Sequence, residues 1–167
     1  MKKLFLSLVS IFVLMSLCSC QTNAKSFSKE TYCYFCSKEQ KPLSGYSVYD
    51  GEKLIALSNS QGFVRIPSEY AEKKLVAKKM DWETIYFTPQ FFQDGTVLCI
   101  SVKHFNDLCF EAASFIKEGD IESAQKIIEK MNGDADLVRA FECALAYKSG
   151  DYEKAHLLLR GLSDESF

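Results

Sequence analysis

The sequence is poor in the residues that build metal and catalytic sites. It has only two histidines, His104 and His156, and neither is part of a zinc-ligand pattern. The single Cys-x-x-Cys, Cys33 to Cys36, lacks the second copy that would complete a four-thiolate site. We therefore predict no metal, no cofactor and no catalytic residue, and expect both histidines on helix or strand surfaces.

The sequence also lacks an apolar run long enough to cross a membrane. A basic start is followed by the apolar stretch from Leu4 to Leu17, and the chain then turns polar. A spanning helix needs about 20 apolar residues, whereas a short apolar run behind lysines is typical of an export signal. We predict that residues 1–19 are a signal peptide that is removed.

The end of this signal carries two cysteines. Leu17, Cys18, Ser19 and Cys20 resemble the bacterial lipobox, in which an aliphatic and a small residue precede the modified cysteine. The resemblance implies lipidation of Cys20 by diacylglyceryl and acyl chains, and two or more chains hold a protein stably on a membrane. Because the next residue, Gln21, is not aspartate, the resemblance favours the outer membrane, facing the periplasm or the cell surface. An ordinary secretory signal is the alternative.

Positive charge is scarce in the second half of the chain. Residues 20–103 hold 11 Lys and Arg against 9 Asp and Glu, whereas residues 104–167 hold 7 against 13. Nucleic acid binding requires a basic face. The acidic half therefore argues against a nucleic acid partner and predicts a solvated surface.

The cysteines form no regular framework. Five lie beyond the lipobox, an odd number that cannot all pair with one another: Cys33, Cys36, Cys99, Cys109 and Cys143. Export permits one disulfide, and Cys33 with Cys99 is the first choice if the first and last strands are neighbours. Buried, inert thiols are the other interpretation.

Residues 29–103, after a polar tether at 20–28, show many short strand-like runs. These runs are rich in β-branched and aromatic residues and are separated by turn signals such as Asp50-Gly51 and Gln61-Gly62. Closely spaced short strands predict an antiparallel β-sandwich of about seven strands. In "GFVRIP", Val64 and Ile66 alternate with Phe63 and Arg65, which predicts that one of these two pairs faces the core.

This region resembles the carboxypeptidase regulatory-like domain, a prealbumin-like β-sandwich. The resemblance is carried by Pro42, Leu43, Gly45 and Val48, and by Asn59, Gly62, Val64 and Ile66. Asp81 and Trp82 stand where that family usually has Gly-Tyr. The resemblance implies an accessory module without metallopeptidase activity.

Two other functions are considered for this region. Cys33 and Cys36 could carry thiol redox chemistry, but residues i and i+3 of a strand point to opposite faces. Carbohydrate binding could use exposed rings. The aromatic candidates are Tyr46, Tyr49, Trp82, Tyr86, Phe91 and Phe92, with Trp82, Tyr86, Phe91 and Phe92 as the ligand contacts.

Residues 104–164 switch to helical periodicity and repeat themselves. A first helix, with apolar residues along one face from Phe105 to Ile116, should stop near Gly119. Seven positions then recur 31 residues later: Gly119, Asp120, Ile121, Ala124, Ile127, Ile128 and Met131 become Gly150, Asp151, Tyr152, Ala155, Leu158, Leu159 and Leu162. "GDYEKAHLLLRGL" is similar to the second half of a tetratricopeptide repeat. We predict two degenerate helical hairpins of this kind; plain hairpins with coincidental similarity are the alternative.

Two repeats leave one apolar end uncovered, because each repeat in such a stack is stabilised by its neighbours. That end packs on the strands or meets another protein. The sequence therefore predicts an α+β protein, a β-sandwich followed by helical hairpins, acting as a non-enzymatic, membrane-anchored envelope lipoprotein that binds a partner protein. Glycan binding is the first alternative, and redox activity at Cys33 and Cys36 the second.

Overall fold

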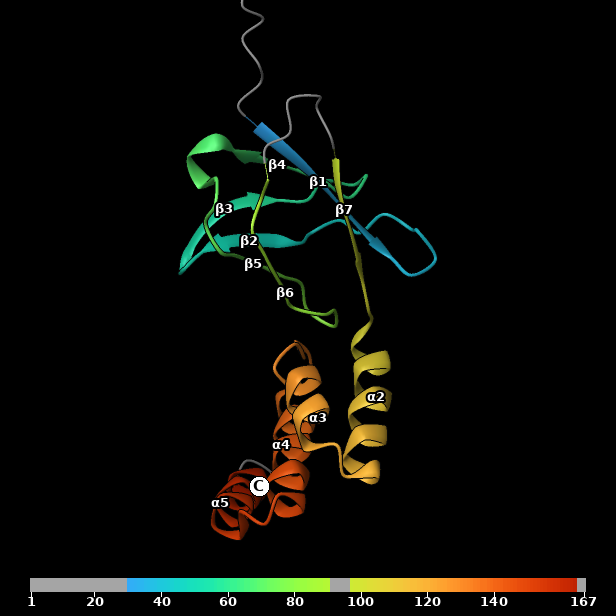
Figure 1. Ribbon diagram of the computed structural model, residues 1–167, viewed down its shortest axis with the longest axis vertical. Helices are drawn as coiled ribbons and strands as arrows, with labels where there is room; N and C mark the ends of the chain where they lie inside the picture. Colours follow the sequence, from blue (N-terminus) through green and yellow to red (C-terminus); the bar gives the residue numbers. More distant parts are fainter. Residues whose placement is uncertain (1–29, 91–96, 165–167) are drawn as a thin grey trace, which may run out of the picture.

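The computed structural model describes residues 30–90 and 97–164, which form an α+β protein with seven strands followed by four α-helices (Figure 1). The strands are β1 (Glu30–Ser37), β2 (Ser47–Asp50), β3 (Lys53–Leu57), β4 (Phe63–Pro67), β5 (Leu75–Lys78), β6 (Ile85–Phe87) and β7 (Val97–Val102). The helices are α2 (Phe105–Glu118), α3 (Ile121–Ile128), α4 (Ala135–Lys148) and α5 (Tyr152–Asp164). Strands and helices occupy opposite ends of the long axis, with β7 running directly into α2 (Figure 1).

The strands form two sheets. One has the order β4-β1-β7 and the other β3-β2-β5-β6. Every pair is antiparallel except β1 and β7, which run parallel with Tyr34 opposite Cys99. The expectation of a purely antiparallel arrangement is therefore wrong at this seam, because the last strand before the helices runs in the same direction as the first.

Both sheets contribute to one core. The predicted alternation is confirmed in β4, and the pair on the core face is Val64 and Ile66, which are buried while Phe63 and Arg65 are exposed. Phe35 of β1 stacks on Tyr46, with ring centroids 4.6 Å apart and planes 4° from parallel. Such pairs contribute about 0.5–1.5 kcal/mol beyond the area that they bury.

Asp81, in the turn after β5, has a backbone conformation that glycine adopts more easily than other residues. Its φ is 65°, in the left-handed region that aspartate adopts more readily than most residues. Its backbone NH donates to the Asn132 carbonyl and its carbonyl accepts from Phe105 NH, each at 2.8 Å. Asp81 therefore joins the strands to two separate parts of the helical region.

The first helix has the predicted limits and the predicted buried face. α2 ends at Glu118, and Gly119 follows in the left-handed conformation with φ 82°. Phe105, Leu108, Ala112 and Ile116 are buried on the face that packs against α3 and α4. The helix ends here because a left-handed residue lets the chain turn while satisfying the last carbonyls.

The α2–α3 and α4–α5 connections have the same hydrogen bonds, 31 residues apart. Gly119 and Gly150 both have positive φ, 82° and 85°. Asp120 NH donates to the Phe115 carbonyl and Asp151 NH donates to the Ala146 carbonyl, both at 2.9 Å. Ser123 NH donates to Asp120 Oδ1 and Lys154 NH donates to Asp151 Oδ1, both at 3.1 Å. Ala124 and Ala155, which follow these turns, are both buried.

Candidate functional site

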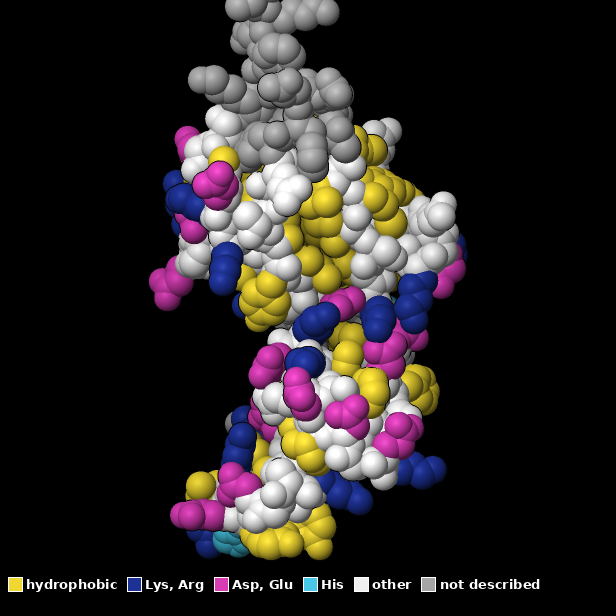
Figure 2. Space-filling model, in the orientation of Figure 1, with side chains coloured by type: hydrophobic (Ala, Val, Ile, Leu, Met, Phe, Trp, Pro, Cys, Tyr) yellow, Lys and Arg dark blue, Asp and Glu magenta, His cyan; other side chains and the backbone are white. Residues whose placement is uncertain are grey.

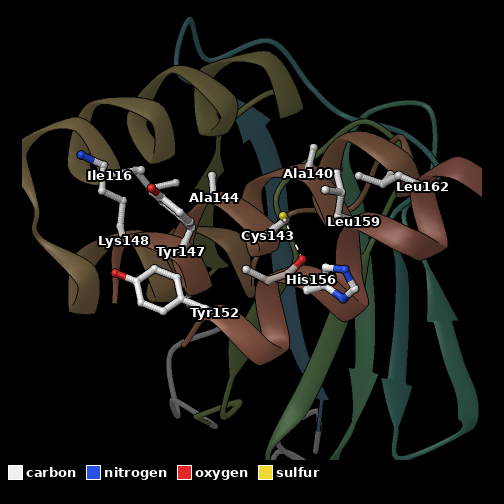
Figure 3. A pocket seen from close by; sticks show the side chains of 11 residues that line it. Ile116, Ala140, Cys143, Ala144, Tyr147, Lys148, Tyr152, His156, Leu159 and Leu162 are labelled. Carbon is white, nitrogen blue, oxygen red and sulfur yellow. Dashed lines mark hydrogen bonds between the residues drawn. The ribbon is translucent and has the colours of Figure 1, made fainter. Parts of the chain in front are cut away.

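An apolar groove lies on the helices at the end away from the strands (Figure 3). Its volume is about 560 Å³, and it lies between α4 and α5, with Ile116 from the end of α2. From α4 come Ala140, Cys143, Ala144, Tyr147 and Lys148; from α5 come Tyr152, Ala155, His156, Leu159 and Leu162. The spacing of three and four residues on each helix places these side chains on one face of each.

The groove is lined by small side chains along its length and by larger side chains at its ends. Ala140, Ala144 and Ala155 leave room between the helices, and the Cys143 thiol donates to the Ala155 carbonyl at 3.3 Å. In Figure 3 Ile116 and the two tyrosines lie toward one end of the groove, while Leu159 and Leu162 lie toward the other. The Tyr147 and Tyr152 rings meet edge to face, with centroids 5.4 Å apart. The groove is therefore apolar along its length and bordered by larger side chains at both ends.

The groove is open to solvent. Tyr147, Tyr152 and Leu159 are 62%, 64% and 57% exposed. Figure 2 shows hydrophobic side chains gathered at this end of the molecule. Contiguous exposed apolar surface of this kind marks interaction sites in soluble domains.

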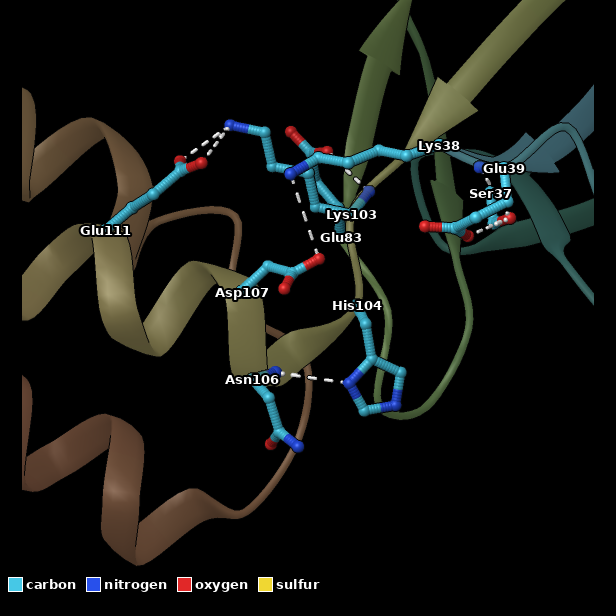
Figure 4. A network of polar contacts seen from close by, with 9 residues as sticks. All are labelled: Ser37, Lys38, Glu39, Glu83, Lys103, His104, Asn106, Asp107 and Glu111. Atoms are coloured by element: carbon cyan, nitrogen blue, oxygen red, sulfur yellow. Dashed lines mark hydrogen bonds and ion pairs between the residues drawn. The ribbon is translucent and has the colours of Figure 1, made fainter.

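A cluster of polar side chains around Glu83, here called the joint, connects the strands to the helices (Figure 4). Glu83, only 6% exposed, accepts from Lys103 NH at 3.1 Å and pairs with Lys130 Nζ at 3.2 Å. Lys103 in turn pairs with Glu111 of α2 at 2.6 Å. Charged side chains of both signs gather where the two regions meet (Figure 2). Glu83 is thus held by the end of β7 and by the segment after α3.

Main-chain hydrogen bonds tighten this joint. Thr84 NH donates to the Lys130 carbonyl at 2.8 Å, and Glu83 NH donates to the Lys103 carbonyl at 3.0 Å. The Tyr46 hydroxyl donates to the Glu83 carbonyl at 3.1 Å. Burial raises the pKa of the Tyr46 hydroxyl, and the nearby charge of Glu83 raises it further. This hydroxyl therefore keeps its proton. The joint therefore fixes the helices on the strand region.

The candidate glycan contacts are not brought together in the described residues. Trp82 is half-buried at the joint, where its ring meets His104 edge to face at 5.1 Å. Tyr86 is 63% exposed on β6. Phe91 and Phe92 lie outside the residues that the structure describes, as does the lipobox cysteine Cys20.

The cysteines correct the expected pairing. β1 and β7 are neighbours, but Cys33 faces the core, and it is Cys36 Sγ that lies 3.8 Å from Cys99 Sγ. Burial raises the pKa of the Cys33 thiol to about 12. Cys33 and Cys36 point to opposite faces of β1, as expected for residues i and i+3 of a strand. All five cysteines of the described residues are free thiols.

The two histidines lie far apart in the structure, at the start of α2 and on α5. His104 begins α2, and its Nδ1 accepts from Asn106 NH at 3.2 Å. His156 is exposed beside the groove. Within residues 30–90 and 97–164, no group of three or more His, Cys, Asp or Glu side chains could hold a metal ion. In the same part of the chain, no helix combines the length and the apolar character needed to span a bilayer.

Sequence reasoning found part of the groove and missed the rest. The sequence predicted an uncovered apolar end on the helical region, and Tyr152, Ala155, Leu159 and Leu162 are among the positions that match at the 31-residue offset. The wall from α4 was missed. Its signal is a second apolar stripe, Ala140, Cys143, Ala144 and Tyr147, beside the core stripe Val138, Phe141 and Leu145.

Comparison with protein-family models, with curated proteins and with solved structures gave no match to this chain.

Proposed function

We propose that this chain is a non-enzymatic envelope lipoprotein, anchored through lipids on Cys20, that binds an amphipathic helix of a partner protein. The observation that carries the proposal is the open apolar groove of about 560 Å³ between α4 and α5. An apolar groove between helices is a common seat for the apolar face of a partner helix. The strand region, in this proposal a β-sandwich resembling the carboxypeptidase regulatory-like domain, is the stem between anchor and groove.

The packing of α4 explains why the occupant is a helix. α4 lies against α2 and α3, and its Val138, Phe141 and Leu145 enter their shared core. One repeat later, α4 and α5 present the equivalent surface, and no helix among residues 30–90 and 97–164 packs upon it. The hydrogen bonds that recur at the 31-residue offset support the proposal that these hairpins are degenerate tetratricopeptide-like repeats. A partner helix then takes the place of the next repeat.

The charges around the groove indicate the polar part of the partner. Lys148 lies in the apolar lining and Arg160 lies beside it. They stand out because residues 104–167 as a whole hold 7 Lys and Arg against 13 Asp and Glu. We therefore propose a partner helix whose apolar face is bordered by acidic residues, and expect its binding to weaken as salt rises.

The arrangement of the molecule suits this role. β1, the first described element, begins at one end of the long axis, and α5 lies at the other (Figure 1). A lipid anchor before β1 would hold the chain at the membrane while the groove points away from it. The joint at Glu83 fixes this orientation.

A photo-crosslinking experiment in intact cells tests the proposal. A photoreactive amino acid replaces Leu159, 57% exposed in the groove, or Leu57, 59% exposed on β3, as the matched control. Position 159 should give one discrete adduct, in which the captured peptide is an amphipathic helix with acidic flanks. No adduct at 159, or the same adduct from both positions, would reject the proposed site.

The anchor has its own test. Metabolic palmitate labelling of the native protein should give a labelled product that Cys20→Ala abolishes. Cys143→Ala, which leaves the lipobox intact, is the control and should keep the label. An unlabelled native product would remove the proposed membrane location and leave the groove to be judged separately.

A further inference from the structure

Two thiols face each other across the seam between the first and last strands. β1 and β7 pair in parallel, with Tyr34 opposite Cys99 and Cys36 opposite Ser101. Alternate residues share a face of a sheet, so Cys36 and Cys99 lie diagonally on the face opposite the core. Their Sγ atoms are 3.8 Å apart, and the Cys36 thiol also points to the Ile100 carbonyl at 3.9 Å.

We propose that Cys36 and Cys99 form a reversible disulfide that joins β1 to β7. The two sulfur atoms are already in contact, and a bond requires them to approach from 3.8 Å to about 2.05 Å. The other described cysteines are placed elsewhere: Cys33 faces the core, and Cys109 and Cys143 lie on α2 and α4.

The two thiols differ in access, which gives the reaction an order. Cys99 is exposed, whereas Cys36 is 2% exposed. The Cys99 thiolate attacks the disulfide of an oxidant RSSR, forms a mixed disulfide and releases one RS⁻, which takes up a proton as RSH. The Cys36 thiolate then attacks Cys99 Sγ and displaces the second RS⁻. The protein loses two electrons and two protons, and the oxidant becomes two RSH.

The surroundings of Cys36 set the pH dependence of the second step. Burial raises the pKa of the Cys36 thiol, and this cause persists in the mixed disulfide; in the fully reduced protein the hydrogen bond and charge of Cys99 raise that pKa further. The thiolate is the attacking species, so ring closure should accelerate as pH rises. The product would fasten β7 to β1 just before the chain enters α2, independently of whether the groove is occupied.

The experiment uses the full chain, purified in detergent and fully reduced, with oxidised glutathione as the probe. After acid quenching and alkylation of the remaining thiols, mass spectrometry of the digested protein should find one peptide pair linked through Cys36 and Cys99. Dithiothreitol should restore both thiols. Cys99→Ser and Cys36→Ser should each abolish the pair, whereas the control Cys143→Ser should keep it.

Three results would overturn the proposal. One is Cys99 recovered only as its glutathione adduct, with Cys36 alkylated in the same molecules. Another is a linkage of Cys99 to Cys33 in place of Cys36. The third is full alkylation of both thiols after prolonged exposure to excess oxidised glutathione. The exposed position of Cys99 keeps the test decisive if substitution at Cys36 impairs folding.

Discussion

Replacing Glu83 by alanine removes a buried carboxylate that links the strands to the helices. Glu83 is 6% exposed, accepts a hydrogen bond from Lys103 NH at 3.1 Å and pairs with Lys130 at 3.2 Å. The truncation leaves the Lys103 NH without this acceptor and Lys130 without its partner. Glu83→Ala therefore tests whether the joint stabilises the fold.

The expected loss follows from these two contacts. A hydrogen bond to a charged group contributes about 1.5–3 kcal/mol. The side chain of Lys130 is 42% exposed, so solvent screens the ion pair, which adds roughly 0–1 kcal/mol. We expect Glu83→Ala to lower the free energy of unfolding by about 2–3 kcal/mol. For a chain of this size the melting temperature then falls by roughly 10 °C.

Thermal and urea unfolding, followed by circular dichroism, measure this loss. The matched control is Glu122→Ala, which breaks an ion pair with Lys126 at 2.6 Å between side chains that are 81% and 66% exposed. We expect that control to leave the free energy of unfolding nearly unchanged, because solvent screens an ion pair between exposed side chains. Equal effects of the two substitutions, or no effect of Glu83→Ala, would refute the reasoning about the joint.

Three further predictions concern the strand region. Gly62→Ala should lower the free energy of unfolding by more than about 3 kcal/mol, because φ is +79° and the new Cβ would lie 2.5 Å from the Phe35 carbonyl oxygen. The control Gly51→Ala, at φ +60° in open space, should lower it by about 1 kcal/mol. Equal losses in urea unfolding would contradict this prediction. Ser58→Ala should cost about 2–4 kcal/mol in the same assay, because the buried Ser58 hydroxyl bonds two main-chain groups at 2.8 and 2.9 Å, and a neutral effect would contradict it. Burial raises the pKa of the Cys33 thiol from 9.0 to about 12, so the unfolded chain loses this proton at lower pH than the folded chain. The free energy of unfolding should therefore fall as pH rises from 9.0 to about 12, by up to about 1.4 kcal/mol per pH unit. Cys33→Ala should make the free energy of unfolding less dependent on pH in this range, and an unchanged dependence would refute the prediction.

Local patterns predicted the features that depend on neighbours along the chain. Alternation predicted that one pair of β4 residues faces the core, which proved to be Val64 and Ile66, and helical periodicity with Gly119 gave the face and the end of α2. These features are set by backbone period and by capping, which act over a few residues.

Features made by distant residues were missed. That Cys36, and not Cys33, lies next to Cys99 depends on the parallel register of β1 and β7, which joins residues 63 apart and which no local pattern predicts. The burial of Glu83 depends on Lys130, 47 residues further along the chain. The α4 wall of the groove was missed because alanine and cysteine read equally well as core filling, and only the position of α5 makes them a surface.

The affinity of the segment captured at position 159 tests the central claim most directly. That segment is synthesised as a fluorescent peptide and titrated with the full chain, with Leu159→Glu and with the control Leu57→Glu, at low salt. A carboxylate in the groove should weaken binding by at least about tenfold, equivalent to about 1.4 kcal/mol, while the substitution on β3 leaves it unchanged. Equal affinities of all three proteins would contradict the assignment of the α4–α5 groove as the binding site.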